Sequence, residues 1–379
     1  MAQSTTSTTA GTPARIATFK DKNRQEAITG FSFIAPAFII LFGFLIIPMF
    51  VAGFFSLTNW NGITPISRGL VTEDNPNGAF EFVGLENYNT ILFNEGRRQE
   101  SFYTALKNTV YYALGVVPVQ TVFALVLAFI VNQKWLKGKG FFRTAFYFPS
   151  ITSSVVISLI FMWMFSASGL VNTAISFFNP AYDPVTWLDN PTGTLHMLMN
   201  GIGINPTRDM LRACDPATLQ LWGCEIASIR LWDWLSGPSV TMATIMVLNI
   251  WTTIGTMMVI YLAALQGIPS QVYEAATVDG ASRMQLFRYI TVPLLQPTTF
   301  FVVTIGLIGA LQVFDQVYVM TSGGPANTTL TVAYLVYRSA FDDSRMGLAA
   351  ATAIVLFVII FIFTLIQRRV TREASGAGS

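Results

Sequence analysis

Reactive side chains are scarce in this 379-residue sequence. It has one histidine, His196, so the chain alone provides neither a histidine dyad for catalysis nor a histidine-based metal site. A phosphate-binding loop needs Gly, four residues, Gly-Lys and then Ser or Thr, but Gly138-Lys139 is followed by Gly140. We therefore predict that the chain is not an enzyme and that it binds neither a metal nor a cofactor itself.

Polar side chains within apolar segments are the remaining candidates for chemistry. Such side chains are costly in a bilayer and usually face the interior of a helix bundle. Neutral amides and hydroxyls near Trp251 would suit a sugar, which offers many uncharged hydroxyl groups and an apolar ring face. The alternative is that they only join helices through hydrogen bonds of about 1 kcal/mol. The candidates are Asn249, Thr252, Thr253, Thr256, Gln312, Asp315 and Gln316.

Long apolar segments must position these side chains. Hydrophobic residues make up 53% of the sequence and charged residues only 11%, against roughly 25% charged in an ordinary globular protein. Six runs approach or exceed the ~20 residues that a helix needs to cross a bilayer. The sequence therefore predicts an all-α polytopic membrane protein. The predicted spans are 29–57, 105–131, 146–166, 239–264, 298–320 and 347–367.

The distribution of Lys and Arg predicts the orientation of the chain. Positive residues near the ends of spans favour the cytoplasmic side, and an internal N-terminus places 13 of them there and eight outside. Both termini are then cytoplasmic, with a disordered polar leader at 1–28 and a tail at 371–379. Residues 58–104 and 167–238 become external loops. The net charge of +2 gives no reason to expect a nucleic acid partner.

The only two cysteines lie in the second external loop, at Cys214 and Cys224. Thiols on the oxidising side of the membrane can form a disulfide. The alternative is two free cysteines in an insertion.

The segment 266–297, here called the polar elbow, is unusually polar for this chain. Pro269 and Ser270 can start a helix, with the Ser270 hydroxyl as the N-terminal cap, and Gly280 can end it in the left-handed conformation. Ser282 and Gln285 have the spacing of a capping box for a second helix. We predict two short helices that either dock on a partner protein or lie on lipid headgroups.

A known family shares the sequence of the polar elbow. Glu274-Ala275-Ala276, then Gly280 and Pro293-Leu294, resembles the coupling-loop signature of permease subunits of binding-protein-dependent ABC importers. Four further stretches resemble the carbohydrate branch of that family, the maltose- and glycerol-phosphate-type permeases. These stretches are FVGLENY at 82–88, ALKNT at 105–109, RTAFYFP at 143–149 and FDQVYVMTSGGP at 314–325.

The resemblance implies the type I importer permease fold, with a cytoplasmic coupling helix in the inner membrane. It further implies a second homologous permease subunit, two ATPase subunits that bind ATP and Mg, and an extracytoplasmic sugar-binding protein. The implied coupling residues are Tyr273, Glu274, Ala275, Ala276, Asp279 and Gly280.

In the maltose-type members the sugar contacts lie on the fourth and fifth spans. Asn249-Ile250-Trp251 matches the start of that region, whereas Ala310 and Val313 stand where other members have polar contacts. We therefore choose Gln312 as the polar contact on the fifth span. Asp315 could instead be a structural group near an outer gate.

A secondary transporter or channel for a small polar solute, with no need for ATP, is the alternative function. Such proteins commonly hold several ionisable residues at the midplane, whereas Asp315 is the only acid within the predicted spans.

Overall fold

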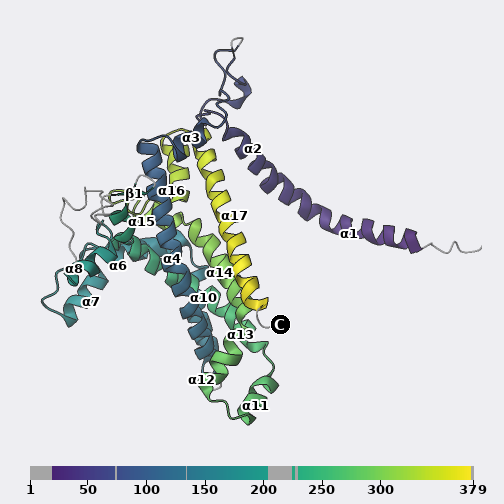
Figure 1. Cartoon of the computed structure of the whole chain (residues 1–379), viewed down its shortest axis with the longest axis vertical. Helices are drawn as coiled ribbons and strands as arrows, with labels where there is room; N and C mark the ends of the chain where they lie inside the picture. Colours follow the sequence, from purple (N-terminus) through teal and green to yellow (C-terminus); the bar gives the residue numbers. More distant parts are fainter. Residues whose placement is uncertain (1–18, 73–74, 134, 204–223, 227–228, 377–379) are drawn as a thin grey trace, which may run out of the picture. The chain divides into compact units, whose positions relative to one another are not determined.

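A helix satisfies its own backbone hydrogen bonds, which is why long apolar segments fold as helices where water is absent. The computed structural model describes residues 19–72, 75–133, 135–203, 224–226 and 229–376. The chain divides into two units, residues 1–54 and 55–379, and each is described by itself (Figure 1).

The first unit is one apolar helical run. It consists of α1 (Phe19–Leu41), the π-helical turn η1 (Phe42–Ile46) and α2 (Ile47–Phe55). Its 30 residues from Glu26 to Phe55 are long and apolar enough to cross a membrane. Residues 19–28, which we expected to be disordered, belong to α1, while residues 1–18 lie outside the described residues.

The second unit contains the remaining elements. Up to the middle of the chain they are η2 (Ile66–Arg68), α3 (Glu86–Leu92), α4 (Arg97–Asn132), α5 (Lys139–Ile151), α6 (Ser154–Met164), α7 (Leu170–Phe178) and α8 (Thr194–Gly201). After the short antiparallel pair β1 (Glu225–Ile226) and β2 (Ile229–Arg230) they are α9 (Leu231–Leu235), α10 (Val240–Gln266), α11 (Ser270–Val278), α12 (Arg283–Gln285), η4 (Leu286–Thr291), α13 (Val292–Leu294), α14 (Gln296–Leu311), α15 (Asp315–Met320), α16 (Val332–Tyr337), η5 (Arg338–Asp342) and α17 (Met346–Gly376).

Five described helices are long and apolar enough to be membrane spans, and a bent pair brings the number to six. That pair is α5 and α6, which meet at 98° around Thr152 and Ser153. The third predicted span, 146–166, therefore corresponds to a bent pair of helices. Span boundaries also moved: α4 begins at Arg97, inside the predicted external loop, and α17 continues to Gly376, into the predicted tail.

The fifth predicted span, 298–320, also contains an interruption. Here α14 ends at Leu311 and α15 begins at Asp315, with Gln312 and Phe314 outside the helical conformation. The two interruptions matter because non-helical backbone at membrane depth is tolerated only where protein covers it or where it lines a cavity.

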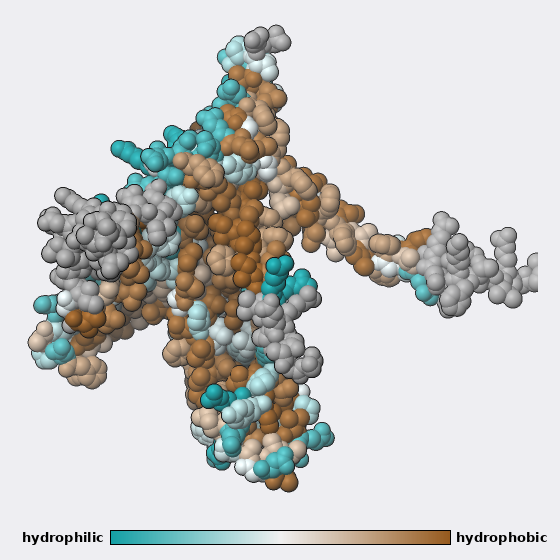
Figure 2. All heavy atoms as spheres, in the orientation of Figure 1, coloured by the Kyte–Doolittle hydropathy of each residue, from teal (hydrophilic) through white to brown (hydrophobic). Residues whose placement is uncertain are grey.

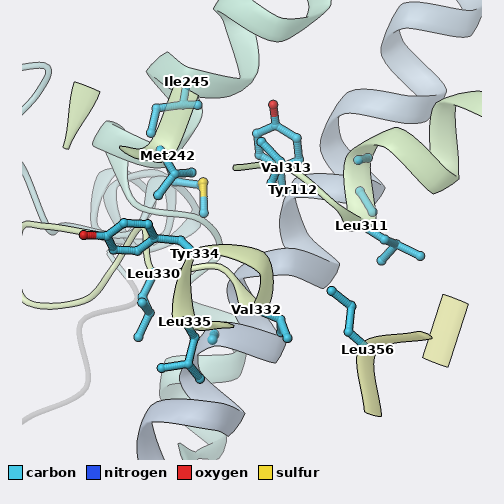
Figure 3. Close-up of a cluster of buried hydrophobic side chains, with 14 of the residues drawn as sticks. Tyr112, Met242, Ile245, Leu311, Val313, Leu330, Val332, Tyr334, Leu335 and Leu356 are labelled. Atoms are coloured by element: carbon cyan, nitrogen blue, oxygen red, sulfur yellow. The ribbon is translucent and has the colours of Figure 1, made fainter. Parts of the chain in front are cut away.

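The core of the second unit lies where α4 packs against α10 and α14. Tyr112 of α4, Met242 of α10 and Leu311 of α14 are almost completely buried there, together with side chains of α16 and α17 (Figure 3). The outer surface of these helices is largely hydrophobic, and hydrophilic residues gather toward the two ends of this unit (Figure 2). This pattern is typical of a bundle surrounded by lipid.

Candidate functional site

Two neighbouring cavities lie at the two interruptions of the helices. The first, of about 270 Å³, lies between the α5–α6 bend and α10. The second, of about 310 Å³, lies between α4, α10, α14 and the α14–α15 break. Asn249, Thr253, Met257 and Gln316 line both cavities, so the two are adjacent parts of one polar region.

All seven polar candidates from the sequence, including Gln316, line this region. Asn249 and Thr253 face both cavities, Thr252 and Thr256 face the first, and Gln312 and Asp315 face the second. Trp251, in contrast, lines neither cavity, and its ring packs against that of Phe161 with centroids 5.5 Å apart. The structure therefore brings the polar candidates together and separates Trp251 from them.

The threonines of α10 are held by hydrogen bonds at one turn of the helix. The Thr252 hydroxyl donates to the Asn249 carbonyl oxygen at 2.9 Å, and the Thr253 hydroxyl lies 2.8 Å from the same oxygen. Thr253 also donates to Oε1 of Gln120, on α4, at 2.6 Å. Thr253 thus links two helices at the wall of the second cavity.

Asp315 has a structural partner on the bent third span. Its Oδ2 accepts a hydrogen bond from the Ser154 hydroxyl at 2.7 Å. Ser154 is the first residue of α6 and Asp315 the first residue of α15, so the bond joins the two interrupted spans.

Sequence reasoning missed several polar residues of this region, including Gln120, Ser150, Thr152 and Ser154. The run of Ser and Thr after Pro149 was a usable signal, since such residues within an apolar span can accompany a break. Gln120 gave a weaker signal, because it is a single amide in a long apolar helix.

The cavity walls are almost uncharged. Among the described residues that line the two cavities there is no Lys, Arg or His, and Asp315 is the only acid. The remaining polar groups are amides and hydroxyls. Such a wall can form many hydrogen bonds with an uncharged, hydroxyl-rich molecule, but it offers no positive group to an anion.

The first helix of the polar elbow, α11, ends as the sequence indicated. Gly280 has φ +81°, in the left-handed region that favours glycine. Its N–H donates to the Thr277 carbonyl oxygen at 3.1 Å, and the Ala281 N–H donates to that of Ala276 at 2.9 Å. These two bonds form a Schellman cap.

Its second helix begins with the predicted capping box, in which Ser282 and Gln285 bond to each other's backbone. The predicted cap at Ser270 was wrong. Pro269 holds the N-cap position of α11, and no side chain caps it.

The polar elbow presents unpaired and apolar groups to its surroundings. Glu274 is exposed, and no described residue forms an ion pair with it. Val278 is 88% exposed and Met284 71%. A shallow hollow of about 340 Å³, which Asp279 and Gly280 help to line, lies on the same segment.

One contact joins the two helical parts of the polar elbow to each other, and a second joins the polar elbow to α4. The Tyr273 hydroxyl lies 3.0 Å from the Thr291 hydroxyl, and the Phe287 ring meets the Phe129 ring of α4 at 5.1 Å. The polar elbow is found at the opposite end of α4 from α3 (Figure 1).

Comparison with known proteins decides the family. Residues 120–375 match the family model described as "Binding-protein-dependent transport system inner membrane component". The probable ABC transporter permease protein YurN of Bacillus subtilis is 30% identical, over 91% of this chain and 96% of that protein. The chain belongs to this family. It is thus a multi-pass inner membrane component, and the predicted resemblance to ABC importer permeases is confirmed.

Other relatives of this permease have names that refer to sugars. The multiple sugar-binding transport system permease protein MsmF of Streptococcus mutans is 29% identical, over 91% of this chain and 95% of that protein. The lactose transport system permease protein LacF of Rhizobium radiobacter is 28% identical, over 92% of this chain and 96% of that protein.

Solved structures confirm the fold of the permease. A chain of a bacterial ABC transporter involved in the import of the acidic polysaccharide alginate matches with a TM-score of 0.65. The identity is 21%, and the match covers 93% of this chain and 98% of that chain. At this identity the match establishes the fold alone.

The predicted disulfide stays a prediction. Cys214 lies outside the described residues, and Cys224 lies just before β1.

Proposed function

We propose that this permease forms half of the pore of an ATP-driven importer for a neutral sugar or sugar derivative. A second, homologous permease subunit would supply the other half. Cargo would arrive from an extracytoplasmic sugar-binding protein, and both termini of this chain would be cytoplasmic. The uncharged cavity walls and the sugar-related names of MsmF and LacF support a neutral sugar as cargo.

The substrate contacts in this proposal are six of the polar residues at the cavities. The amides of Asn249 and Gln312 would bond sugar hydroxyls directly. The hydroxyls of Thr252, Thr253 and Thr256 have the same chemistry. Asp315 would play a mainly structural part through Ser154.

The energy source in this proposal is a pair of separate ATPase subunits, which bind ATP and Mg. The main support is the polar elbow: a capped helix that exposes Glu274, with small residues Ala275 and Ala276 beside it. Small side chains allow a partner backbone to come close, and an exposed carboxylate can meet a basic or amide group. Tyr273, Asp279 and Gly280 would complete the coupling surface.

The experiment is ATP-driven sugar uptake by the reconstituted importer with Glu274→Lys or Gly280→Pro in this chain. Glu274→Lys reverses the charge at the interface. Proline has φ near −65° and therefore destroys the cap at Gly280. We expect each variant to assemble in the membrane with uptake lowered by at least about tenfold.

Glu95→Lys is the matched control, because it reverses an exposed acid far along the chain from the polar elbow. Normal uptake in both elbow variants would refute the docking role. A secondary transporter makes a different prediction: uptake would stop when the membrane potential is collapsed while ATP remains.

A further inference from the structure

Gln120 is a buried amide with one unsatisfied end. The side chain is 1% exposed and lies in α4, at the wall of the second cavity. Its Oε1 accepts the hydrogen bond from Thr253 at 2.6 Å, whereas its Nε2 donates to no acceptor among the described residues. With the two ends of the amide exchanged, Nε2 would donate to the Thr253 hydroxyl and Oε1 would be the free end, so one end of the amide is unpaired in either orientation.

The unpaired end lies at the cavity. A Cβ atom placed on Gly306 of α14 would collide with the Gln120 Nε2, and Gly306 lines the same cavity. The amide nitrogen therefore occupies the space that a side chain at position 306 would fill. Thr253 fixes the other end, so the amide has little freedom to turn its nitrogen elsewhere.

An unpaired amide at this place needs a physical explanation. The nitrogen is not one of the fully buried side-chain atoms that lack a partner among the described residues, so it opens onto the cavity. A donor at a cavity wall that is not paired within the protein is free to bond a molecule in the cavity. A glutamine held by Thr253 beside a glycine is arranged to receive an acceptor that enters the cavity.

We propose that Gln120 contacts the cargo, with its amide donating a hydrogen bond to an oxygen of a neutral saccharide in the second cavity. Thr253 positions the amide, and Gly306 leaves room for it. This inference rests on the proposed function, since it requires a sugar to pass through this cavity. It adds a contact from α4 to those expected from α10 and from the α14–α15 break.

The test uses the complete importer in proteoliposomes with its binding protein at saturation. The probe is whichever of maltose, lactose or raffinose the wild-type importer takes up fastest, together with the monodeoxy analogues of that sugar. Loss of one directed hydrogen bond to the sugar predicts about tenfold slower uptake by Gln120→Leu. A tenfold change corresponds to a free-energy difference of about 1.4 kcal/mol. Thr121→Val is the matched control, because Thr121 is the next residue, is buried and lines neither cavity.

The deoxy analogues separate a cargo contact from a structural role. If Gln120 donates to one sugar oxygen, the analogue without that oxygen is transported poorly by the wild type and equally poorly by Gln120→Leu, with no further loss. Should Gln120→Leu fail to assemble, Gln120→Met is used, which keeps the length and flexibility of the side chain.

Uptake and analogue preference equal to those of the wild type would overturn the role of Gln120 and leave the proposed function standing. An equal loss for every analogue would also overturn it. If the wild-type importer shows no ATP-dependent uptake of any of the three sugars, the proposed cargo class itself is wrong.

Discussion

The hydrogen bond between Ser154 and Asp315 connects two residues that are 161 positions apart in the sequence. Each residue is the first of a short helix that follows an interruption in a span, so the bond fixes the relative position of α6 and α15. Hydrogen bonds to a charged group typically contribute about 1.5–3 kcal/mol. This contact therefore helps to join the walls of the two cavities.

We expect Ser154→Ala and Asp315→Ala each to lower the thermal stability of the purified permease, by about 1–2 kcal/mol. Because both variants remove the same bond, the double variant should lose little more than either single one. Thermal unfolding in nanodiscs measures this. Ser150→Ala is the control, since Ser150 lines the same cavity but bonds within its own helix, to the Tyr147 carbonyl oxygen. Additive losses in the double variant would show that the two side chains act independently.

The polar elbow was predictable as an element, because its caps depend on a few neighbouring residues. Gly280 and the Ser282–Gln285 pair are local signals, and both appear in the structure. The angle of the bend after α5, 98°, was not predictable in the same way. Hydropathy reports how apolar a segment is and contains no information on its direction, so the predicted span 146–166 could not show how sharply the chain turns.

Among the cavity residues, too, some could be found from the local sequence and others only from the packing of helices. Asn249 and Gln312 were found because polar groups within spans point inward. Gln120 was missed because its importance arises from Thr253 and Gly306, which lie on two other helices. Only the packing of three helices brings these groups together.

Asn108, in the ALKNT stretch of α4, bonds to the loop between α15 and α16. Its Nδ2 donates to the carbonyl oxygens of Asn327 and Leu330, both at 2.9 Å. The neighbouring Thr109 hydroxyl accepts from the Val332 N–H at 3.0 Å. The ALKNT stretch therefore anchors the loop between α15 and α16.

We expect Asn108→Leu to loosen that loop, because the buried Leu330 carbonyl loses its partner at a cost of about 1–3 kcal/mol. The loop should then be cut faster by protease, and the melting temperature should fall. Asn89→Leu is the control, since the Asn89 side chain bonds only to Asn94 on the exposed surface of α3. An unchanged rate of cleavage at residues 321–331 would contradict the anchoring role.

At the scale of the whole molecule, the distribution of charge predicts which end faces the cytoplasm. The polar elbow contributes Arg283 and Arg288 to one end, and Arg368 and Arg369 follow the last predicted span. Acids prevail in the segments assigned to the outside, for example Asp342 and Asp343 after α16. Since Lys and Arg near span ends favour the cytoplasmic side, this asymmetry predicts that the polar elbow and both termini are cytoplasmic.

Labelling with a membrane-impermeant maleimide tests this orientation. The background is a variant with Cys214→Ser and Cys224→Ser, which has no other cysteine. We expect Asp343→Cys to react in intact cells, because its segment is predicted to face outward. Arg283→Cys, on the exposed surface of the polar elbow, should react only after the membrane is permeabilised. The two cysteines control for each other, since each is exposed and each should be labelled in permeabilised cells. Labelling of Arg283→Cys in intact cells would place the polar elbow outside, where no ATPase could reach it, and the coupling role of α11 would then be wrong.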